Sequence, residues 1–244
     1  MLFFAPIMPD LIFQIMAVYV LAAVLPAIFL MRYVYRQDQA EPEPMGLLVS
    51  LIGKGILAAL AAIVLEVLGQ ALLDGLVPED NPNYVYYMAF LVVAAVEEGT
   101  KYFFLYRRTW NDPNFNYRFD AIVYAVFVSL GFAAFENVKY VFTYGLSVAL
   151  PRAILAVPGH MGFAVFMGIF YGRAKRCADW GNRLGCRINL MLSYLFPVVL
   201  HGVYDSCCMT GTNRSTLVFV IFVVVMYLLV FRLIHRESKT DIPV

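Results

Sequence analysis

Two adjacent carboxylates and a lysine, Glu97, Glu98 and Lys101, lie in the middle of a stretch that is otherwise typical of a membrane-spanning helix. The rest of residues 84–105 is mostly apolar or aromatic. Each ionisable group at the centre of a lone transmembrane helix costs about 2.5–3.5 kcal/mol on insertion scales, so three together would cost about 8–10 kcal/mol. The fold must therefore supply partners for these groups, and this requirement constrains the rest of the chain.

The composition is that of a polytopic membrane protein. The chain of 244 residues is 62% hydrophobic and 14% charged, whereas soluble domains are about 45–50% apolar. A hydrocarbon core of about 30 Å takes roughly 20 helical residues to cross. We expect an all-α bundle forming one domain over residues 1–244, with about seven transmembrane helices at 11–35, 45–73, 84–106, 119–146, 152–172, 188–208 and 215–234.

The placement of basic residues predicts the orientation. The loops after the first, third, fifth and seventh spans hold 13 of the 18 Lys and Arg, and cytoplasmic loops carry such an excess. The N-terminus is therefore predicted outside and the C-terminus inside. The start of the chain lacks the positive region of a signal peptide, so we interpret it as part of a retained span. The formal net charge of +1 argues against a nucleic-acid partner.

Candidate partners for the charged triad occur in three other spans. They are Glu136, Asn137 and Tyr140 in span 119–146, His160 in span 152–172, and His201 with Asp205 in span 188–208. Counting about 1.5 Å of helical rise per residue from the nearest span end puts these groups between the midplane and the outer third of the membrane. We therefore expect them to meet in one intramembrane site.

Acids and imidazoles gathered in a low-dielectric cavity suit water-mediated hydrolysis. Histidines and a carboxylate can hold a divalent metal with one open position while another carboxylate takes a proton from water. Paired carboxylates also suit a metal-free version, so both zinc and no metal stay open. The candidate catalytic residues are Glu97, Glu98, Glu136, His160, His201 and Asp205, with Lys101, Asn137 and Tyr140 supporting them and with His160, His201 and Glu136 as candidate metal ligands.

These motifs together resemble the PrsW family of intramembrane proteases, distant relatives of the CAAX prenyl endopeptidases. The resemblance rests on Glu97-Glu98-x-x-Lys101, the stretch from Gly131 to Tyr140, His160 with the small residues that follow it, His201-x-x-x-Asp205, and Glu41-Pro42-Glu43-Pro44 before the second span. At the position of Asp205, CAAX-type relatives often carry asparagine.

The resemblance implies an endopeptidase of the bacterial plasma membrane that cuts a single-span, membrane-anchored protein, as in the regulated proteolysis of an anti-sigma factor. It implies that Glu97, Glu98, Glu136, His160 and His201 are active-site residues. The family is grouped with metalloproteases, although its relatives have also been interpreted as glutamate-activated hydrolases. The sequence does not indicate the oligomeric state.

Two other functions fit parts of the pattern. Acidic residues and histidines inside membranes also form relays, so a proton- or cation-coupled transporter is the main alternative. A non-catalytic scaffold that binds a partner helix through Gly168-x-x-x-Gly172 is another. Outside the candidate site, Glu66 is interpreted as an interfacial side chain, and Asp120 as a structural carboxylate in the first turn of its helix.

Overall fold

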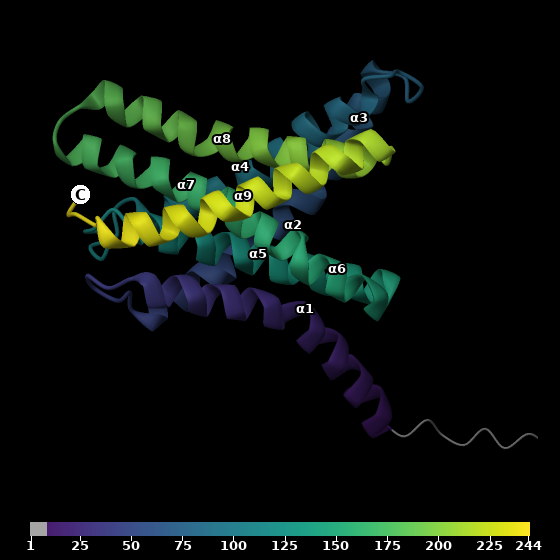
Figure 1. Ribbon diagram of the computed structural model, residues 1–244, viewed down its shortest axis with the longest axis horizontal. Coiled ribbons are helices and arrows are strands. Elements are labelled where there is room, and N and C mark those ends of the chain that lie inside the picture. Colours follow the sequence, from purple (N-terminus) through teal and green to yellow (C-terminus); the bar gives the residue numbers. More distant parts are fainter. Residues whose placement is uncertain (1–8) are drawn as a thin grey trace, which may run out of the picture.

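The protein is helical nearly throughout, as Figure 1 shows. The structure, a computed structural model, describes residues 9–244, so the prediction for the start of the chain lies largely outside the described residues. The elements are α1 (Pro9–Gln37), α2 (Met45–Leu76), α3 (Tyr84–Tyr87), the π-helical segment η1 (Met88–Ala94), α4 (Ala95–Thr109), α5 (Asp120–Tyr144), the 3₁₀ segment η2 (Leu146–Val148), α6 (Ala149–Ile154), α7 (Ala156–Asp179), α8 (Arg183–Thr210) and α9 (Asn213–Lys239). The prediction of an all-α fold is confirmed.

Six of the predicted spans correspond to helical segments that are long and apolar enough to cross a membrane: α1, α2, α5, the run from η2 to α7, α8 and α9. The predicted span 84–106 is the continuous helical run of α3, η1 and α4, which packs against α2, α5 and α8. This run is less apolar because it carries the charged triad. Figure 1 shows the start of α1 and the C-terminus at opposite ends of the bundle, as an odd number of crossings requires.

Some predicted boundaries differ from the observed ones. The basic segment 173–187, expected to be a loop, is helical except for a turn at residues 180–182, where Gly181 has a φ of 74°. Lys and Arg are good helix formers, so both helices continue through the segment that was expected to be a loop. Asn182 begins α8 by accepting the N–H of Gly185 at 2.9 Å.

Helix α5 forms the core of the bundle and packs against α1, α2 and α7. Its contact with α7 depends on the small residues that follow His160. A Cβ at Gly168 would collide with the backbone of Ile122, and one at Gly172 with the carbonyl of Arg118. This groove is therefore already filled by α5, which contradicts the scaffold interpretation that left it open for a partner helix.

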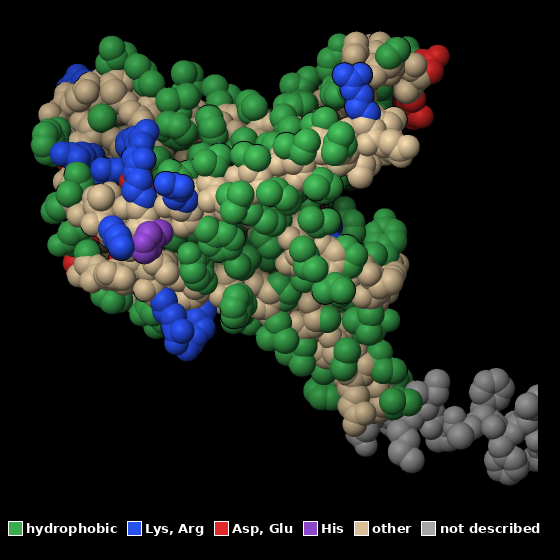
Figure 2. All heavy atoms as spheres, viewed as in Figure 1, with side chains coloured by type: hydrophobic (Ala, Val, Ile, Leu, Met, Phe, Trp, Pro, Cys, Tyr) green, Lys and Arg blue, Asp and Glu red, His purple; other side chains and the backbone are tan. Residues whose placement is uncertain are grey.

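The outer surface of the bundle is mostly apolar, as contact with a lipid bilayer requires. Figure 2 shows hydrophobic side chains over most of the visible face, on α9 and the helices beside it. Large apolar residues such as Phe29, Leu72 and Leu228 are more than 60% exposed, which a membrane protein tolerates because lipid covers them. Lys and Arg gather at the end where α9 finishes, the side predicted to be cytoplasmic.

Candidate functional site

The charged triad lies directly after the π-helical segment η1, and this segment helps to orient it. Extra residues per turn in a π-helix rotate the helix beyond it, and such segments are frequent at functional sites. Phe90 in η1 packs against Gly202 of α8, where any Cβ would collide with its ring. This close approach brings Glu98 of α4 against His201 of α8, with 2.9 Å between Glu98 Oε1 and His201 Nδ1.

Lys101 is the centre of the cluster and is fully buried. Its Nζ donates to Glu97 Oε2 at 3.0 Å and to Glu98 Oε1 at 2.8 Å, and lies 3.1 Å from His160 Nδ1. The same ammonium lies 4.0 Å from the centre of the Phe132 ring. The lysine therefore compensates both carboxylates at once, which explains how a membrane-embedded helix accommodates three charged groups.

The rings of the two histidines pack edge to face beside this centre, with centroids 5.5 Å apart. Because an ammonium only donates, His160 Nδ1 must accept from Lys101, and its proton is on Nε2, which faces Glu136 Oε2 at 3.1 Å. His201 faces a carboxylate on both nitrogens, Glu98 through Nδ1 and Asp205 through Nε2 at 3.2 Å. With both carboxylates ionised, His201 donates through both nitrogens.

Arg152 also belongs to this cluster, although its position at the predicted end of a span gave no sign of this. Its guanidinium donates to Glu136 Oε2 at 2.7 Å and to Asn137 Oδ1 at 2.6 Å, and it lies over the ring of Tyr140. The backbone turns between α6 and α7, and α6 therefore packs against the outer end of α5. Asn137 also donates to the carbonyl of Ala23, so it ties the cluster to α1.

A cavity of about 60 Å³ adjoins the cluster, enough for a few water molecules. Its polar walls include Glu97 and Glu136, together with Tyr140, Lys139 and Glu66. The sequence predicted Glu66 at the membrane interface, whereas the structure places it on this cavity. Glu66 on α2 and Glu136 on α5 lie at similar distances from the outer ends of their helices. This similarity in depth is the sequence feature that could have placed Glu66 at the site.

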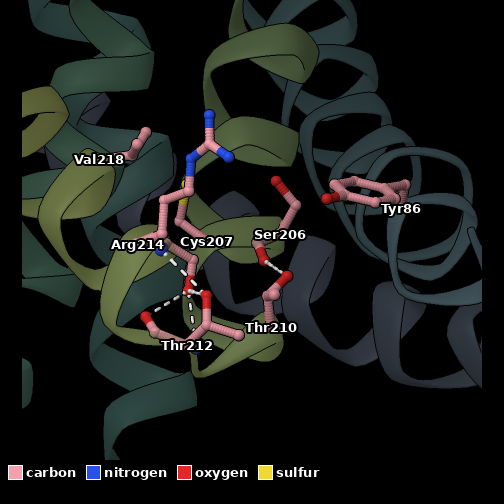
Figure 3. Close-up of a pocket in the computed structure, with 8 residues that line it drawn as sticks. Tyr86, Ser206, Cys207, Thr210, Thr212, Arg214 and Val218 are labelled. Atoms are coloured by element: carbon pink, nitrogen blue, oxygen red, sulfur yellow. Dashed lines mark hydrogen bonds between the residues drawn. The ribbon is translucent and has the colours of Figure 1, made fainter. Parts of the chain in front are cut away.

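Two larger hollows open nearer the predicted extracytoplasmic end. One, of about 370 Å³, is lined by Asp205, Arg152 and Tyr140 together with apolar residues of α6 and α8. The other, of about 300 Å³, is shown in Figure 3, where Arg214, Cys207 and the hydroxyls of Ser206, Thr210 and Thr212 surround it. The second hollow has no carboxylate or imidazole in its lining, whereas the first is lined by Asp205 and Arg152, which contact the cluster.

The cluster contains residues that fit a divalent metal. One ligand atom each from Glu97, Glu98 and His201 lies within 4.8 Å of the others. Glu98 Oε2 is buried and has no hydrogen-bond partner. Carboxylates and imidazole are common zinc ligands, so the donor chemistry is suitable. This set shares only His201 with the predicted ligands His160, His201 and Glu136, which remain a prediction.

An all-helical membrane bundle with carboxylates on a small internal cavity and imidazoles that contact the same carboxylate cluster has the features of an intramembrane hydrolase. Residues 43–232 match the model of the PrsW family intramembrane metalloproteases, and the chain belongs to this family. It is 30% identical over 221 residues to Protease PrsW of Oceanobacillus iheyensis, covering 91% of this chain and 96% of that protein.

Two further relatives agree. The chain is 35% identical over 184 residues to Protease PrsW of Geobacillus kaustophilus, covering 75% of this chain and 76% of the relative. It is 31% identical over 185 residues to Protease PrsW of Bacillus subtilis, covering 75% and 79%. No solved structure matches. The protein is therefore an intramembrane endopeptidase with several membrane spans, and the transporter interpretation has no support.

Proposed function

We propose that the whole chain forms one protease domain in the cell membrane and cuts a single-span membrane protein with water from the cavity beside Glu97 and Glu136. The observation that carries the proposal is the coincidence of acids, imidazoles and a water-sized space inside the bundle. A peptide bond in lipid can be hydrolysed only where water and a proton acceptor are held together.

Glu97 is the residue that we assign to take the proton from water. It lines the cavity, whereas its neighbour Glu98 is completely buried and does not. Glu136 also lines the cavity, but Arg152 and His160 both hold its Oε2. Among residues 9–244, Glu97 forms an ion pair with Lys101 alone, which leaves it freer to accept a proton.

The other side chains have positioning and proton-transfer roles in this proposal. Glu98 and Asp205 fix His201 between them. The protonated His201 can give a proton to the leaving amine, and the proton that Glu97 took from water then restores His201. Arg152 and Tyr140 lie where the outer hollow meets the cluster, so they are placed to donate to the carbonyl oxygen of the substrate. In this arrangement Asn137 holds Arg152 rather than contacting the substrate.

Glu98 and His201 are the residues that would hold a metal such as zinc, with Glu97 close to both and free to act as the base. When bound, the metal would polarise the substrate carbonyl and make water more acidic. Lys101 now neutralises the same carboxylates, so binding would require its ammonium to move aside. Without a metal, the same lysine keeps Glu97 oriented toward the cavity.

The substrate would approach through the hollow of about 370 Å³ beside α6 and α8. That volume suits a few residues of an extended peptide. It opens in the half of the bundle predicted to face outward, so we propose a cut in the outer half of the substrate's span. A membrane-anchored regulator such as an anti-sigma factor has the topology that this geometry requires.

The test is cleavage of candidate single-span proteins by the purified chain in liposomes. Glu97→Gln keeps the shape of the side chain but cannot take a proton, so we expect cleavage to fall by about 10²–10⁴-fold. Glu79→Gln, an exposed glutamate in the loop after α2, is the matched control and should cleave normally. Equal cleavage by the parent and Glu97→Gln would refute the assignment.

Elemental analysis of the same preparations decides the role of a metal. About one zinc per chain in the parent, lost in His201→Ala, would identify the metal-dependent version. A parent that cleaves after its metal has been removed would identify the glutamate-dependent version.

A further inference from the structure

A second cluster of buried carboxylates lies at the predicted cytoplasmic end of the bundle, where it is separated from the protease site along α5. Asp38 follows the last residue of α1, Glu43 immediately precedes Pro44 and α2, and Asp120 begins α5. Their exposed fractions are 5%, 4% and 1%. One carboxylate oxygen from each lies within 4.8 Å of the others. Three helix ends therefore place three acids around one point.

Hydrogen bonds orient two of these carboxylates and leave the remaining oxygens free. The hydroxyl of Tyr124 donates to Glu43 Oε1 at 2.8 Å, and the backbone N–H groups of residues 116–117 donate to Asp120 Oδ2 at 3.0 and 2.6 Å. Glu43 Oε2, Asp120 Oδ1 and both carboxylate oxygens of Asp38 are buried without a hydrogen-bond partner. Buried acceptors left unpaired in this way are costly and call for an explanation.

No basic side chain balances these charges. Within residues 9–244, none of the ion pairs includes Asp38, Glu43 or Asp120. The neighbouring Arg118 is paired with Glu237 at 2.6 Å. Something other than a lysine or arginine must therefore compensate the cluster.

The C-terminal segment contributes a fourth carboxylate next to this cluster. Asp241 Oδ1 accepts the backbone N–H groups of Phe119 and Ile242 at 2.9 and 3.0 Å, and its Oδ2 is buried without a partner. The segment is held in place by the N–H of Arg118, which donates to the carbonyl of Ile242 at 3.1 Å. The end of the chain is thus fixed beside the start of α5.

We propose that Asp38, Glu43 and Asp120, with Asp241 beside them, form a binding site for a hard divalent cation, Mg²⁺ or Ca²⁺. Such ions prefer carboxylate oxygens, and ligands on opposite sides of Ca²⁺ are about 4.6–5.2 Å apart, so three oxygens within 4.8 Å can share one ion. The ion joins the ends of α1, α2 and α5. It acts on stability and does not depend on the proposed catalytic roles.

The experiment measures binding of Ca²⁺ and Mg²⁺ to the full chain in detergent after chelation, by calorimetry. It uses a Glu98→Gln background, so that the intramembrane carboxylates do not contribute a second site. We expect about one ion per chain and a loss of at least tenfold in affinity in Asp38→Asn. Asp179→Asn, which removes a more exposed acid paired with Lys175, is the matched control and should bind like the parent.

Thermal unfolding with and without the cation provides a second test of the site. Without a cation, Asp38→Asn should be at least as stable as the parent because it removes a buried charge, whereas only the parent should gain stability when Ca²⁺ or Mg²⁺ is added. If Asp38→Asn does not fold, Glu43→Gln decides the matter in its place. The proposal would be overturned if the parent bound no cation, or if the parent and the folded variant bound it equally. Either result would mean that protons alone neutralise the cluster.

Discussion

Replacing Lys101 by methionine tests whether the lysine is what permits two carboxylates inside the bundle. The change keeps the apolar stem and removes an ammonium that lies 3.0 Å from Glu97 and 2.8 Å from Glu98. Breaking a buried ion pair by removing one partner costs about 3–5 kcal/mol. For a chain of this size each 1 kcal/mol lowers the melting temperature by about 2–4 °C. We therefore expect a drop of about 6–20 °C in metal-free detergent solution.

A double variant and a control make this prediction specific. Adding Glu98→Gln to Lys101→Met removes one of the unpaired charges, so part of the lost stability should return, with a coupling energy of about 0.5–3 kcal/mol. Lys175→Met removes a lysine whose partner Asp179 is 38% exposed and should cost less than about 1 kcal/mol. A loss in Lys101→Met no larger than in Lys175→Met, or no coupling to Glu98, would refute the reasoning.

Three further changes test the arginine contact, the helix packing and the metal. Arg152→Gln leaves Glu136 held by His160 alone and should slow cleavage by about 10–100-fold; unchanged cleavage would exclude the arginine from the site. Gly168→Ile drives a side chain into α5 at Ile122 and should cost about 1–3 kcal/mol or more in unfolding experiments; a variant as stable as the parent would contradict the close packing. If a metal is bound, a chelator should abolish cleavage and added zinc should restore it, whereas full activity in chelator would favour glutamate alone.

Long apolar runs and the cost of burying charge were enough to predict the helical bundle and the meeting of its polar groups. Glu97, Glu98 and Lys101 needed partners, and the histidines and acids at similar depth were the available ones. The structure confirms that His160 contacts Lys101 and Glu136, and that His201 contacts Glu98 and Asp205. Their catalytic roles stay predictions.

The sequence could not show how each helix is rotated about its axis, because helices that are apolar on all faces lack a clear periodicity. Glu66 was therefore expected at the membrane interface, whereas it lines the cavity. No local pattern indicated that Arg152 would contact Glu136. Asp38 and Asp120 lie far apart in sequence, and nothing in their local patterns indicated that helix ends would bring them together. Contacts of this kind depend on tertiary packing alone.

The position and chemistry of the cut are the strictest test of hydrolysis inside the bundle by Glu97. The purified chain in liposomes would be given a single-span substrate in ¹⁸O-labelled water, and both fragments would be analysed by mass spectrometry. We predict a cut in the outer half of the span, one labelled oxygen in the new carboxylate, and neither fragment with Glu97→Gln. A cut in the cytoplasmic half, or the same fragments from Glu97→Gln, would contradict this mechanism.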